Sequence, residues 1–332
     1  MQLNYSFIIP VYNRPEEVAE LLESLCLLDY QDFEVVIVED GSTIPCTSVV
    51  DVYKHRLRIT YLSKVNTGPG NSRNYGMQHA SGNYFLILDS DCIIPAGYLT
   101  EVHASLSASY VDFFGGPDAA HESFSDIQKA INFSMTSFLT TGGIRGGTER
   151  VERFQPRSFN MGLSKWAFES TKGFGTIHPG EDPDLVLRLW KAGFKSMLIQ
   201  KAFVFHKRRI SWSKFHVQVR KFGMVRPILN IWHPASKKVT FWFPTLFIVY
   251  VATAVLLALF GNLWLLATIG CYFILLFLAA MTATKSMRIA IFAIFATLIQ
   301  FFGYGTGFIK STYFIGWLKK NPRIKFPQLF FS

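Results

Sequence analysis

One stretch of the sequence decides the fold: Tyr84-Phe85-Leu86-Ile87-Leu88-Asp89-Ser90-Asp91-Cys92-Ile93-Ile94-Pro95. Its first five residues are apolar, the pattern of a buried strand. Parallel strands are covered on both faces, so the charges of Asp89 and Asp91 belong at the strand's end, where open α/β sheets bind ligands. Carboxylate oxygens suit Mg²⁺ or Mn²⁺. The stretch therefore predicts an α/β fold with a metal site; alternatively, the two aspartates only open a turn and cap the next helix.

The preceding residues repeat a strand–helix–strand pattern. Residues 6–11 and 33–38 have the composition of strands, and residues 16–28 carry apolar side chains at helical spacing. Such a βαβ unit makes a right-handed crossover between parallel strands. Residues 57–62 are a third strand candidate. We therefore expect a Rossmann-like domain with a mostly parallel central sheet.

A glycine-rich segment, residues 66–76, follows that third strand candidate. Glycines let a backbone approach a ligand closely, and Arg73 can pair with a phosphate in fork geometry. The spacing matches neither a phosphate-binding P-loop nor a dinucleotide fingerprint. The segment is therefore a candidate phosphate site, with a plain surface loop as the alternative.

Four short motifs lie in residues 4–95. They are Pro10-Val11-Tyr12-Asn13-Arg14, Val38-Glu39-Asp40-Gly41-Ser42, Asn66-Thr67-Gly68 through Arg73-Asn74, and Asp89-Ser90-Asp91. Together, in this order, they resemble the motifs of family 2 glycosyltransferases. The resemblance implies the GT-A fold and a nucleotide-diphosphate sugar donor such as a UDP-sugar. Glu39 stands where an aspartate is more usual, which leaves the preferred base open.

The resemblance also implies a role for each matching residue. Tyr12 would lie against the nucleobase, Asp40 would bind the edge of the base, and Arg73 would touch the diphosphate. Asp91 would hold the metal that bridges the two phosphates, with Asp89 nearer the ribose. The implied donor-binding set is Pro10, Tyr12, Arg14, Asp40, Arg73 and Asp89.

Acidic residues gather again before a predicted helix that ends near Gly193. Glu181, Asp182 and Asp184 lie at its start, where carboxylates cap the helix and interact favourably with its dipole. The resemblance implies more: a catalytic Glu-Asp element in which Asp182 is the base. Carboxylates so close together cannot all keep ordinary pKa values, and a base with a raised pKa suits the reaction.

A histidine follows the last predicted strand, residues 196–205. A lone histidine is usually structural or solvated, but the resemblance implies that His206 contacts the metal or the diphosphate. The metal set implied is thus Asp91, Asp89 and His206. Residues 121–157 are weakly patterned, typical of either an acceptor loop or a disordered loop.

Charge and hydropathy change sharply after Asp184. All 23 acidic residues lie in residues 1–184, whereas 20 of the 33 Lys and Arg follow. Residues 239–284 and 289–309 contain no charge, and stretches of about 20 apolar residues predict membrane spans. Because the basic residues flank these spans, anionic lipid is a better partner than nucleic acid.

Residues 210–232 precede the spans and place Trp212, Phe215 and Val219 on one helical stripe. This pattern indicates a basic interfacial helix, ended by Pro227 and Pro234. The alternative is a helix packed on protein. We therefore expect a GT-A domain in residues 1–208, an interfacial region in 209–238, and two or three membrane helices with a basic tail in 239–332.

The predicted location is the inner, plasma membrane with the catalytic domain in the cytoplasm. Basic loops stay cytoplasmic, which puts Lys285 and Arg288 inside. The start of the chain lacks a secretory signal pattern. The four cysteines lack metal-site spacing, and nothing in them indicates a disulfide framework, consistent with a reducing compartment.

The function predicted from these patterns is an inverting, metal-dependent glycosyltransferase that acts on a lipid-linked or saccharide acceptor. Two alternatives remain. A processive polysaccharide synthase would usually carry a Gln-x-x-Arg-Trp motif, and none follows Asp182. A non-catalytic membrane scaffold would be expected to lose its carboxylates, yet Asp40, Asp89, Asp91 and Asp182 are all present.

Overall fold

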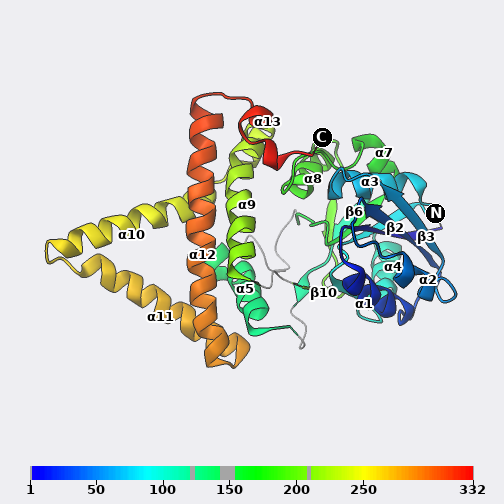
Figure 1. Cartoon of the computed structure of the whole chain (residues 1–332), viewed down its shortest axis with the longest axis horizontal. Helices are drawn as coiled ribbons and strands as arrows, with labels where there is room; N and C mark the ends of the chain where they lie inside the picture. Colours follow the sequence, from blue (N-terminus) through cyan, green and yellow to red (C-terminus); the bar gives the residue numbers. More distant parts are fainter. Residues whose placement is uncertain (1, 120–123, 143–153, 208–210, 332) are drawn as a thin grey trace. The chain divides into compact units, whose positions relative to one another are not determined.

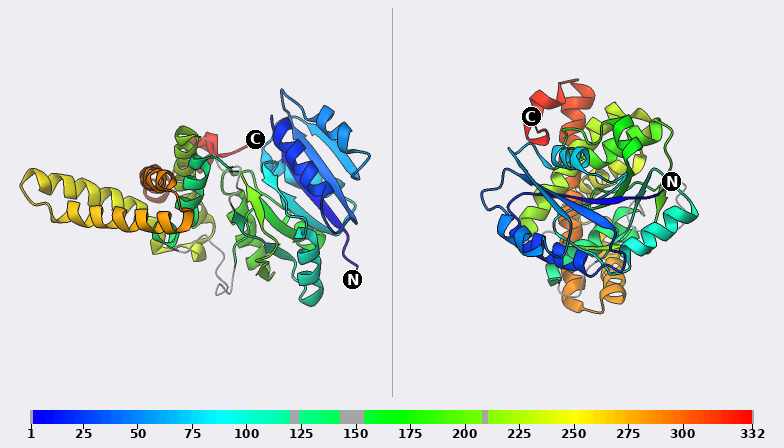
Figure 2. Two further views of the ribbon diagram at one scale, coloured as in Figure 1. Left: turned by 90° about the horizontal axis from the view of Figure 1, so that it is seen from below. Right: turned by 90° about the vertical axis from the view of Figure 1, so that its right-hand side faces the viewer.

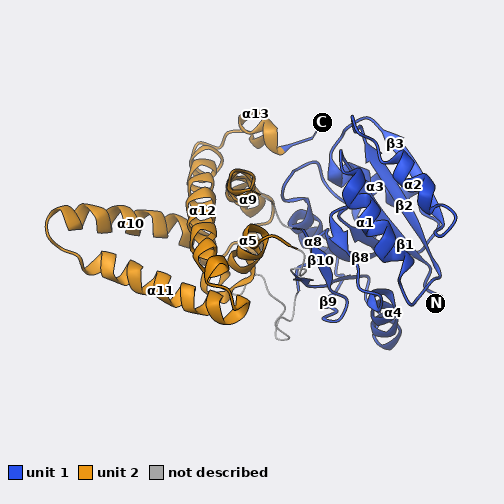
Figure 3. Ribbon diagram, turned by 60° about the horizontal axis from the view of Figure 1, so that its bottom comes forward, with its two compact units in different colours: residues 1–121, 147–207, 330–332 blue, residues 122–146, 208–329 orange. Residues whose placement is uncertain are grey.

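The computed structural model of the chain describes residues 2–119, 124–142, 154–207 and 211–331. It contains two compact units, coloured separately in Figure 3. Unit 1 comprises residues 1–121, 147–207 and 330–332; unit 2 comprises 122–146 and 208–329. Of the weakly patterned stretch 121–157, residues 124–142 thus belong to unit 2, whereas residues 121–123 and 143–153 lie outside the described residues.

Unit 1 is built on a mostly parallel sheet, as predicted (Figure 1). Its seven strands are ordered β3-β2-β1-β4-β8-β6-β9, and only β8 runs antiparallel to its neighbours. The strands are β1 (Tyr5–Val11), β2 (Phe33–Asp40), β3 (Ile59–Lys64), β4 (Tyr84–Leu88), β6 (Phe113–Gly115), β8 (Asn160–Ser164) and β9 (Ser196–Leu198). The carboxyl ends of β1, β2 and β4 therefore lie at one edge.

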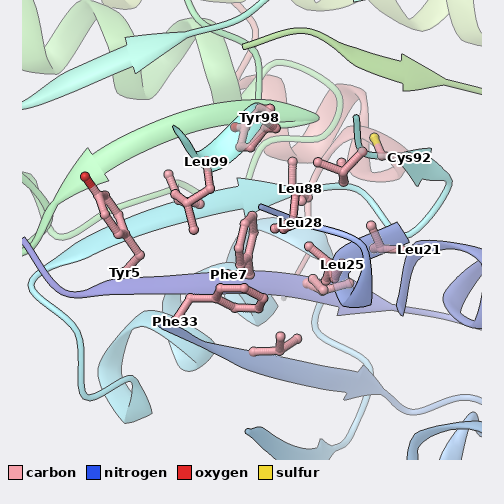
Figure 4. Close-up of a cluster of buried hydrophobic side chains, with 14 of the residues drawn as sticks. Tyr5, Phe7, Leu21, Leu25, Leu28, Phe33, Leu88, Cys92, Tyr98 and Leu99 are labelled. Atoms are coloured by element: carbon pink, nitrogen blue, oxygen red, sulfur yellow. The ribbon is translucent and has the colours of Figure 1, made fainter. Parts of the chain in front are cut away.

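Helices cover both faces of this sheet because side chains alternate along each strand. Phe7 and Ile9 of β1 face a core with α1 (Pro15–Cys26), α2 (Thr47–Tyr53) and α4 (Tyr98–Ala108). Figure 4 shows Phe7, Leu25 and Tyr98 meeting there. Ile8 faces the opposite core with α3 (Pro69–His79), α7 (Lys165–Thr171) and α8 (Glu181–Lys191).

A second, three-stranded sheet has the order β5-β10-β7. Its strands are β5 (Cys92–Ile93), β10 (Val204–His206) and β7 (Asp118–Ala119). In the antiparallel pairing of β10 with β5, His206 lies opposite Cys92. This small sheet therefore brings the histidine at the end of the predicted last strand to the residue that follows Asp91.

Unit 2 is helical. Its helices are α5 (Asp126–Thr136), α6 (Phe138–Thr141), α9 (Trp212–Trp232), α10 (Phe243–Leu259), α11 (Trp264–Thr284), α12 (Met287–Ser311) and α13 (Pro322–Lys325). Short 3-10 turns lie at Pro234–Ser236 (η1), Val239–Trp242 (η2) and Pro327–Leu329 (η4), and a π-helical turn continues α12 at Thr312–Trp317 (η3). Figure 2 shows α10 and α11 as a helical hairpin joined at one end, and Figure 1 shows the two helices diverging from that end.

Three segments of unit 2 are long and apolar enough to cross a membrane: Val239–Leu259, Trp264–Thr284 and Met287–Trp317. Within the apolar stretch of each segment, 11% is buried inside the protein in the first segment and in the second, whereas 39% is buried in the third. The exposed apolar surface is thus concentrated on α10 and α11, whereas α12 is partly a core helix.

Helix α9 differs from the prediction in two respects. It continues through Pro227 to Trp232 rather than ending at the proline. A proline inside a helix loses one hydrogen bond and crowds the carbonyl four residues earlier, and here that carbonyl belongs to Gly223. In addition, Phe215 and Val219 pack against Ile131, Met135 and Ala296. The stripe predicted to lie on a bilayer is thus partly buried against protein.

Close approach of α9 to α12 accounts for glycines on both helices. A Cβ added to Gly307 would lie 2.3 Å from the Arg220 carbonyl oxygen, and one added to Gly223 would lie 2.1 Å from that of Tyr304. Small residues let helix backbones pack closely in apolar surroundings. The two helices are therefore held together by backbone-to-backbone packing.

Candidate functional site

The three predicted metal ligands lie together at the end of β4. His206 Nε2 is 3.2 Å from Asp91 Oδ1 and 3.9 Å from Asp89 Oδ2. The Phe159 ring stacks on the His206 imidazole with centroids 4.7 Å apart, and Lys207 N–H donates to the Asp91 carbonyl at 3.0 Å. The small sheet and the stacked ring thus direct His206 at the two aspartates.

These groups form a donor set suited to a hard divalent cation. One ligand atom from each of Asp91, Cys92 and His206 lies within 4.8 Å of the others. Burial raises the pKa of the Cys92 thiol well above its usual value, so this thiol stays protonated and is a poor ligand. Carboxylate oxygens of Asp91 and Asp89 with the His206 imidazole therefore fit the predicted ion better than a thiolate site does.

Arg14, predicted to bind the donor, donates from Nη1 to Asp91 Oδ2 at 2.7 Å. Its backbone is set by Asn13, which adopts a left-handed conformation with φ of 54°. Asn13 Oδ1 accepts from the N–H groups of Thr43 and Ile44 at 2.8 and 2.9 Å. The loop after β1 is thereby tied to the loop after β2. Asparagine tolerates this conformation better than most residues, a signal that the sequence reasoning did not use.

Arg73 joins the metal cluster to helix α8. Its Nη2 donates to Asp89 Oδ1 at 2.7 Å and its Nη1 to Glu181 Oε1 at 3.3 Å. The guanidinium also lies 5.2 Å from the centre of the Phe174 ring. Arg73 is buried, with 4% of its side chain exposed. The arginine thus lies between carboxylates from β4 and α8 and brings them together.

Asp40 lies at the end of β2 and is buried. Its Oδ1 accepts from Thr67 N–H at 2.9 Å and from Lys64 Nζ, and its Oδ2 accepts from Gly68 N–H at 2.9 Å. A carboxylate has about four acceptor positions, so about one remains for a ligand. The residue predicted to read the nucleobase thus also holds the turn that begins α3.

Pro10 and Tyr12 complete the predicted donor-binding residues. Pro10 lies within β1, and the Tyr12 side chain directly after that strand is 51% exposed. An exposed ring beside the strand ends is available to stack on a planar group. Both residues therefore lie at the edge of the sheet where the carboxylates gather.

The first turn of α8 carries Glu181 and Asp182, whose pKa values move in opposite directions. Burial raises the pKa of Asp182, and the charge of Glu181 raises it further. Burial also acts to raise the pKa of Glu181, but the charges of His178 and Arg73 outweigh it and hold that pKa at about 2. One buried oxygen of Asp182, Oδ1, has no hydrogen-bond partner among the described residues. Asp182 is therefore the carboxylate of the pair with the greater proton affinity.

The third carboxylate of this turn, Asp184, has a different role. It accepts from Arg188 Nε at 3.0 Å, within the same helix. Asp184 thus forms an i,i+4 ion pair that supports α8.

Sequence reasoning missed two residues beside these carboxylates. His178 Nδ1 lies 2.9 Å from Glu181 Oε1. The spacing of three residues before a helix N-terminus was visible in the sequence. Arg157 is close enough to influence the pKa of Asp182, although it is distant in sequence and no motif marks it. The charge environment of Asp182 therefore comes from three separate segments.

Comparison with known proteins identifies the family of this chain. The family model described as "Glycosyl transferase family 2" matches residues 6–172, which contain β1 to β8 and the aspartates at the end of β4. The chain belongs to glycosyl transferase family 2. Membership agrees with the predicted GT-A-like sheet, and this family is one of transferases.

Three curated relatives are similar over parts of their length. A Rickettsia felis protein named as an uncharacterised glycosyltransferase is 42% identical over 86 residues, 26% of this chain and 14% of its own. The poly(ribitol-phosphate) β-N-acetylglucosaminyltransferase TarS of Staphylococcus aureus is 33% identical over 114 residues, 33% and 20% of the two chains. The GalNAc(5)-diNAcBac-PP-undecaprenol β-1,3-glucosyltransferase of Campylobacter jejuni is 26% identical over 208 residues, 60% and 62%. The chain thus covers a minor part of the first two.

Solved structures support the fold. The mannosyltransferase PcManGT of Pyrobaculum calidifontis, solved with GDP-mannose and Mn²⁺, has a TM-score of 0.57 and 17% identity, covering 96% of this chain and 89% of its own. TarS residues 1–349 of S. aureus have a TM-score of 0.51 and 16% identity, covering 95% and 92%. At these identities the likeness concerns the fold alone.

Proposed function

We propose that this protein transfers a sugar, with inversion, from a nucleotide-diphosphate sugar to a lipid-linked acceptor at the cytoplasmic face of a membrane. The observation that carries the proposal is the convergence of two carboxylate clusters through Arg73. Asp89 and Asp91 lie on one side with His206, and Glu181 and Asp182 lie on the other, with Arg73 donating to Asp89 and to Glu181. Family membership supports the reaction class.

Asp91, Asp89 and His206 would hold a divalent cation, Mn²⁺ or Mg²⁺. A bound cation of this kind supplies positive charge to the leaving diphosphate. Arg14 and Arg73 lie against the same two aspartates, at 2.7 Å each. Their guanidinium groups therefore orient the carboxylates and add positive charge at the place where the diphosphate would sit.

Asp182 is the proposed general base. Its raised pKa reflects a greater proton affinity, and its Oδ1, which has no hydrogen-bond partner in the described part of the chain, can accept a proton from the acceptor hydroxyl. The deprotonated oxygen would attack the anomeric carbon from the face opposite the diphosphate, so the O–C bond forms as the bond from that carbon to the phosphate oxygen breaks. Glu181 stays ionised because its pKa is low, and it holds Arg73 in place.

The lipid-linked acceptor is proposed on two grounds. Three segments are long and apolar enough to span a membrane, and the C. jejuni relative is named for an undecaprenol-linked substrate. The basic residues after Asp184 favour an anionic lipid surface. A single sugar addition is favoured over processive synthesis because no Gln-x-x-Arg-Trp motif follows Asp182.

The test begins with the purified full chain and a panel of nucleotide sugars, including UDP-N-acetylglucosamine, UDP-glucose and GDP-mannose. Nucleotide release is measured with Mn²⁺, with Mg²⁺ and with a chelator. We expect nucleotide release with one class of nucleotide sugar, and we expect the chelator to abolish that release. Release that is absent with every donor, or unchanged by the chelator, would contradict the proposal.

The acceptor is tested separately. Polyprenyl diphosphate-linked sugars in liposomes are compared with soluble sugars at equal concentration. The proposal predicts faster transfer to the liposome-bound acceptor and products one sugar longer. Equal rates with the soluble acceptor would leave the helices as an anchor only, and long polymers would favour a processive synthase.

A further inference from the structure

The segment Phe330–Phe331 belongs to unit 1 although residues 208–329 before it belong to unit 2. Phe330 forms an antiparallel bridge with Ile177, and Phe331 N–H donates to the Thr176 carbonyl at 2.9 Å. The Phe331 ring lies beside the His178 ring, with centroids 5.6 Å apart. The segment is therefore paired with residues 176–178, directly before the carboxylates of α8, through one isolated β-bridge and one backbone hydrogen bond.

The same ring rests on the turn that begins α3. A Cβ added to Gly68 would lie 2.2 Å from Phe331 Cδ2, and Gly68 has a φ of +89°. Gly68 was expected to let a ligand approach the backbone closely. The structure instead places the Phe331 ring against it. The missing side chain at position 68 therefore makes room for an aromatic ring of this chain.

Phe331 thus lies between two groups of the proposed site. On one side, Gly68 N–H is held by Asp40 at 2.9 Å, and Gly68 caps the helix that carries Arg73. On the other side, His178 lies 2.9 Å from Glu181. The ring is therefore in contact with the donor-side turn and with the partner of the carboxylate that holds Arg73.

Helix α3 and residues 174–178 form a junction, and the end of this junction away from Gly68 is fixed without Phe331. Asn74 Nδ2 donates to the Phe174 carbonyl at 2.9 Å, and Phe174 N–H donates to Asn74 Oδ1 at 2.8 Å. A Cβ added to Gly70 would lie 2.9 Å from the Gly175 carbonyl oxygen. Helix α3 and residues 174–178 are thus joined at Asn74 and Gly70, and the Phe331 ring completes the junction at Gly68.

We propose that Phe331 is a positioning residue of the active site, which sets the spacing between the Thr67–Gly68 turn and the His178–Glu181 segment. The inference rests on the proposed function, because its effect is on donor binding and transfer. Small displacements of positioned groups are costly to catalysis. Removal of the ring is therefore expected to raise the KM for the donor and to lower kcat.

The test uses the full chain in detergent with UDP-N-acetylglucosamine and GDP-mannose as donors. Phe331→Ala is compared with Phe331→Leu, which keeps apolar bulk, and with Trp166→Ala, which removes an exposed aromatic ring on α7. We expect kcat/KM to fall about tenfold in Phe331→Ala, to recover most of the loss in Phe331→Leu, and to stay unchanged in Trp166→Ala. Thermal unfolding and the fraction of active enzyme are measured in each variant, so that loss of folded protein is separated from altered kinetics.

A double-mutant cycle with Gly68→Ala adds a readout that simple destabilisation does not move. The backbone strain of placing alanine at the positive φ of position 68 is the same in wild type and in Phe331→Ala, so it cancels from the coupling energy. Gly68→Ala should therefore cost less kcat/KM in the Phe331→Ala background than in wild type. Equal costs in both backgrounds, or activity in Phe331→Ala that matches or exceeds wild type, would overturn the inference. A wild-type chain that turns over no donor would instead contradict the proposed function.

Discussion

Replacement of Arg73 by methionine tests the link between the two carboxylate clusters. Arg73 and Glu181 are buried, with 4% and 6% of their side chains exposed, and Arg73 also pairs with Asp89. Methionine keeps apolar volume but leaves Glu181 as a buried charge without its guanidinium partner. Breaking a buried pair in this way costs about 3–5 kcal/mol. With an m-value of about 2 kcal/mol per M, the urea midpoint should fall by about 2 M.

The assay is urea unfolding of the full chain in detergent, read by pulse proteolysis of unit 1. Arg56→Met is the matched control because Arg56 pairs with Glu23 in two-point geometry on the surface. It should leave the midpoint unchanged, since exposed pairs contribute little. Arg73→Met/Glu181→Gln should recover much of the loss because the buried charge is gone. The reasoning is refuted if Arg73→Met shifts the midpoint no more than Arg56→Met does.

The pH dependence of this penalty has a defined sign. The pKa of Glu181 is held at about 2 in the folded protein, against about 4.3 in an unfolded chain. The contribution of ionised Glu181 to the free energy of unfolding is thus fully present above about pH 5 and is lost as the pH falls toward 2. In Arg73→Met, burial favours protonated Glu181. The difference between the variant and wild type should therefore shrink on acidification.

Predictions for four further substitutions concern the pH dependence of the rate and its metal dependence. Glu181→Gln removes a charge that raises the pKa of Asp182, so the acid limb of the kcat profile should move to lower pH. Arg157→Ala removes a charge that lowers the same pKa, and the limb should move to higher pH; shifts in one common direction would contradict the charge assignment. Asp91→Ala should abolish nucleotide release at any Mn²⁺ concentration, whereas His206→Ala should raise the Mn²⁺ concentration that gives half-maximal release. Equal metal dependence in His206→Ala and wild type would remove His206 from the metal set.

Much of the catalytic unit could be predicted because its signals are local. Apolar runs that end in carboxylates mark β2 and β4, and parallel strands bring their carboxyl ends to one edge. The placement of Asp89 and Asp91 at the end of β4, and of Asp40 at the same edge at the end of β2, follows from this rule. That His206 lies near the two aspartates was predicted only from the family resemblance. No local pattern shows it, because β10, which carries His206, pairs with β5 more than 100 residues earlier in the chain.

The unpredicted features depend on contacts between distant segments. Nothing local in Arg157 indicates that its charge influences the pKa of Asp182, and the hydrogen bonds of Asp40 to the Thr67–Gly68 turn come from tertiary packing. Helix α9 also defeated a local rule. Pro227 was expected to end it, but packing against α12 keeps the helix intact. Propensity is a weak guide where tertiary contacts oppose it.

We propose that Asp182 acts as the base in a site that also contains Asp89, Asp91 and His206. The most direct measurement is the rate of sugar transfer by Asp182→Asn at saturating donor, beside Asp51→Asn, which alters an exposed aspartate on α2. General bases contribute about 10²–10⁴-fold. We expect a loss of at least about 100-fold in Asp182→Asn with donor binding retained, and wild-type rates in Asp51→Asn. Transfer by Asp182→Asn at a rate near that of wild type would contradict this proposal.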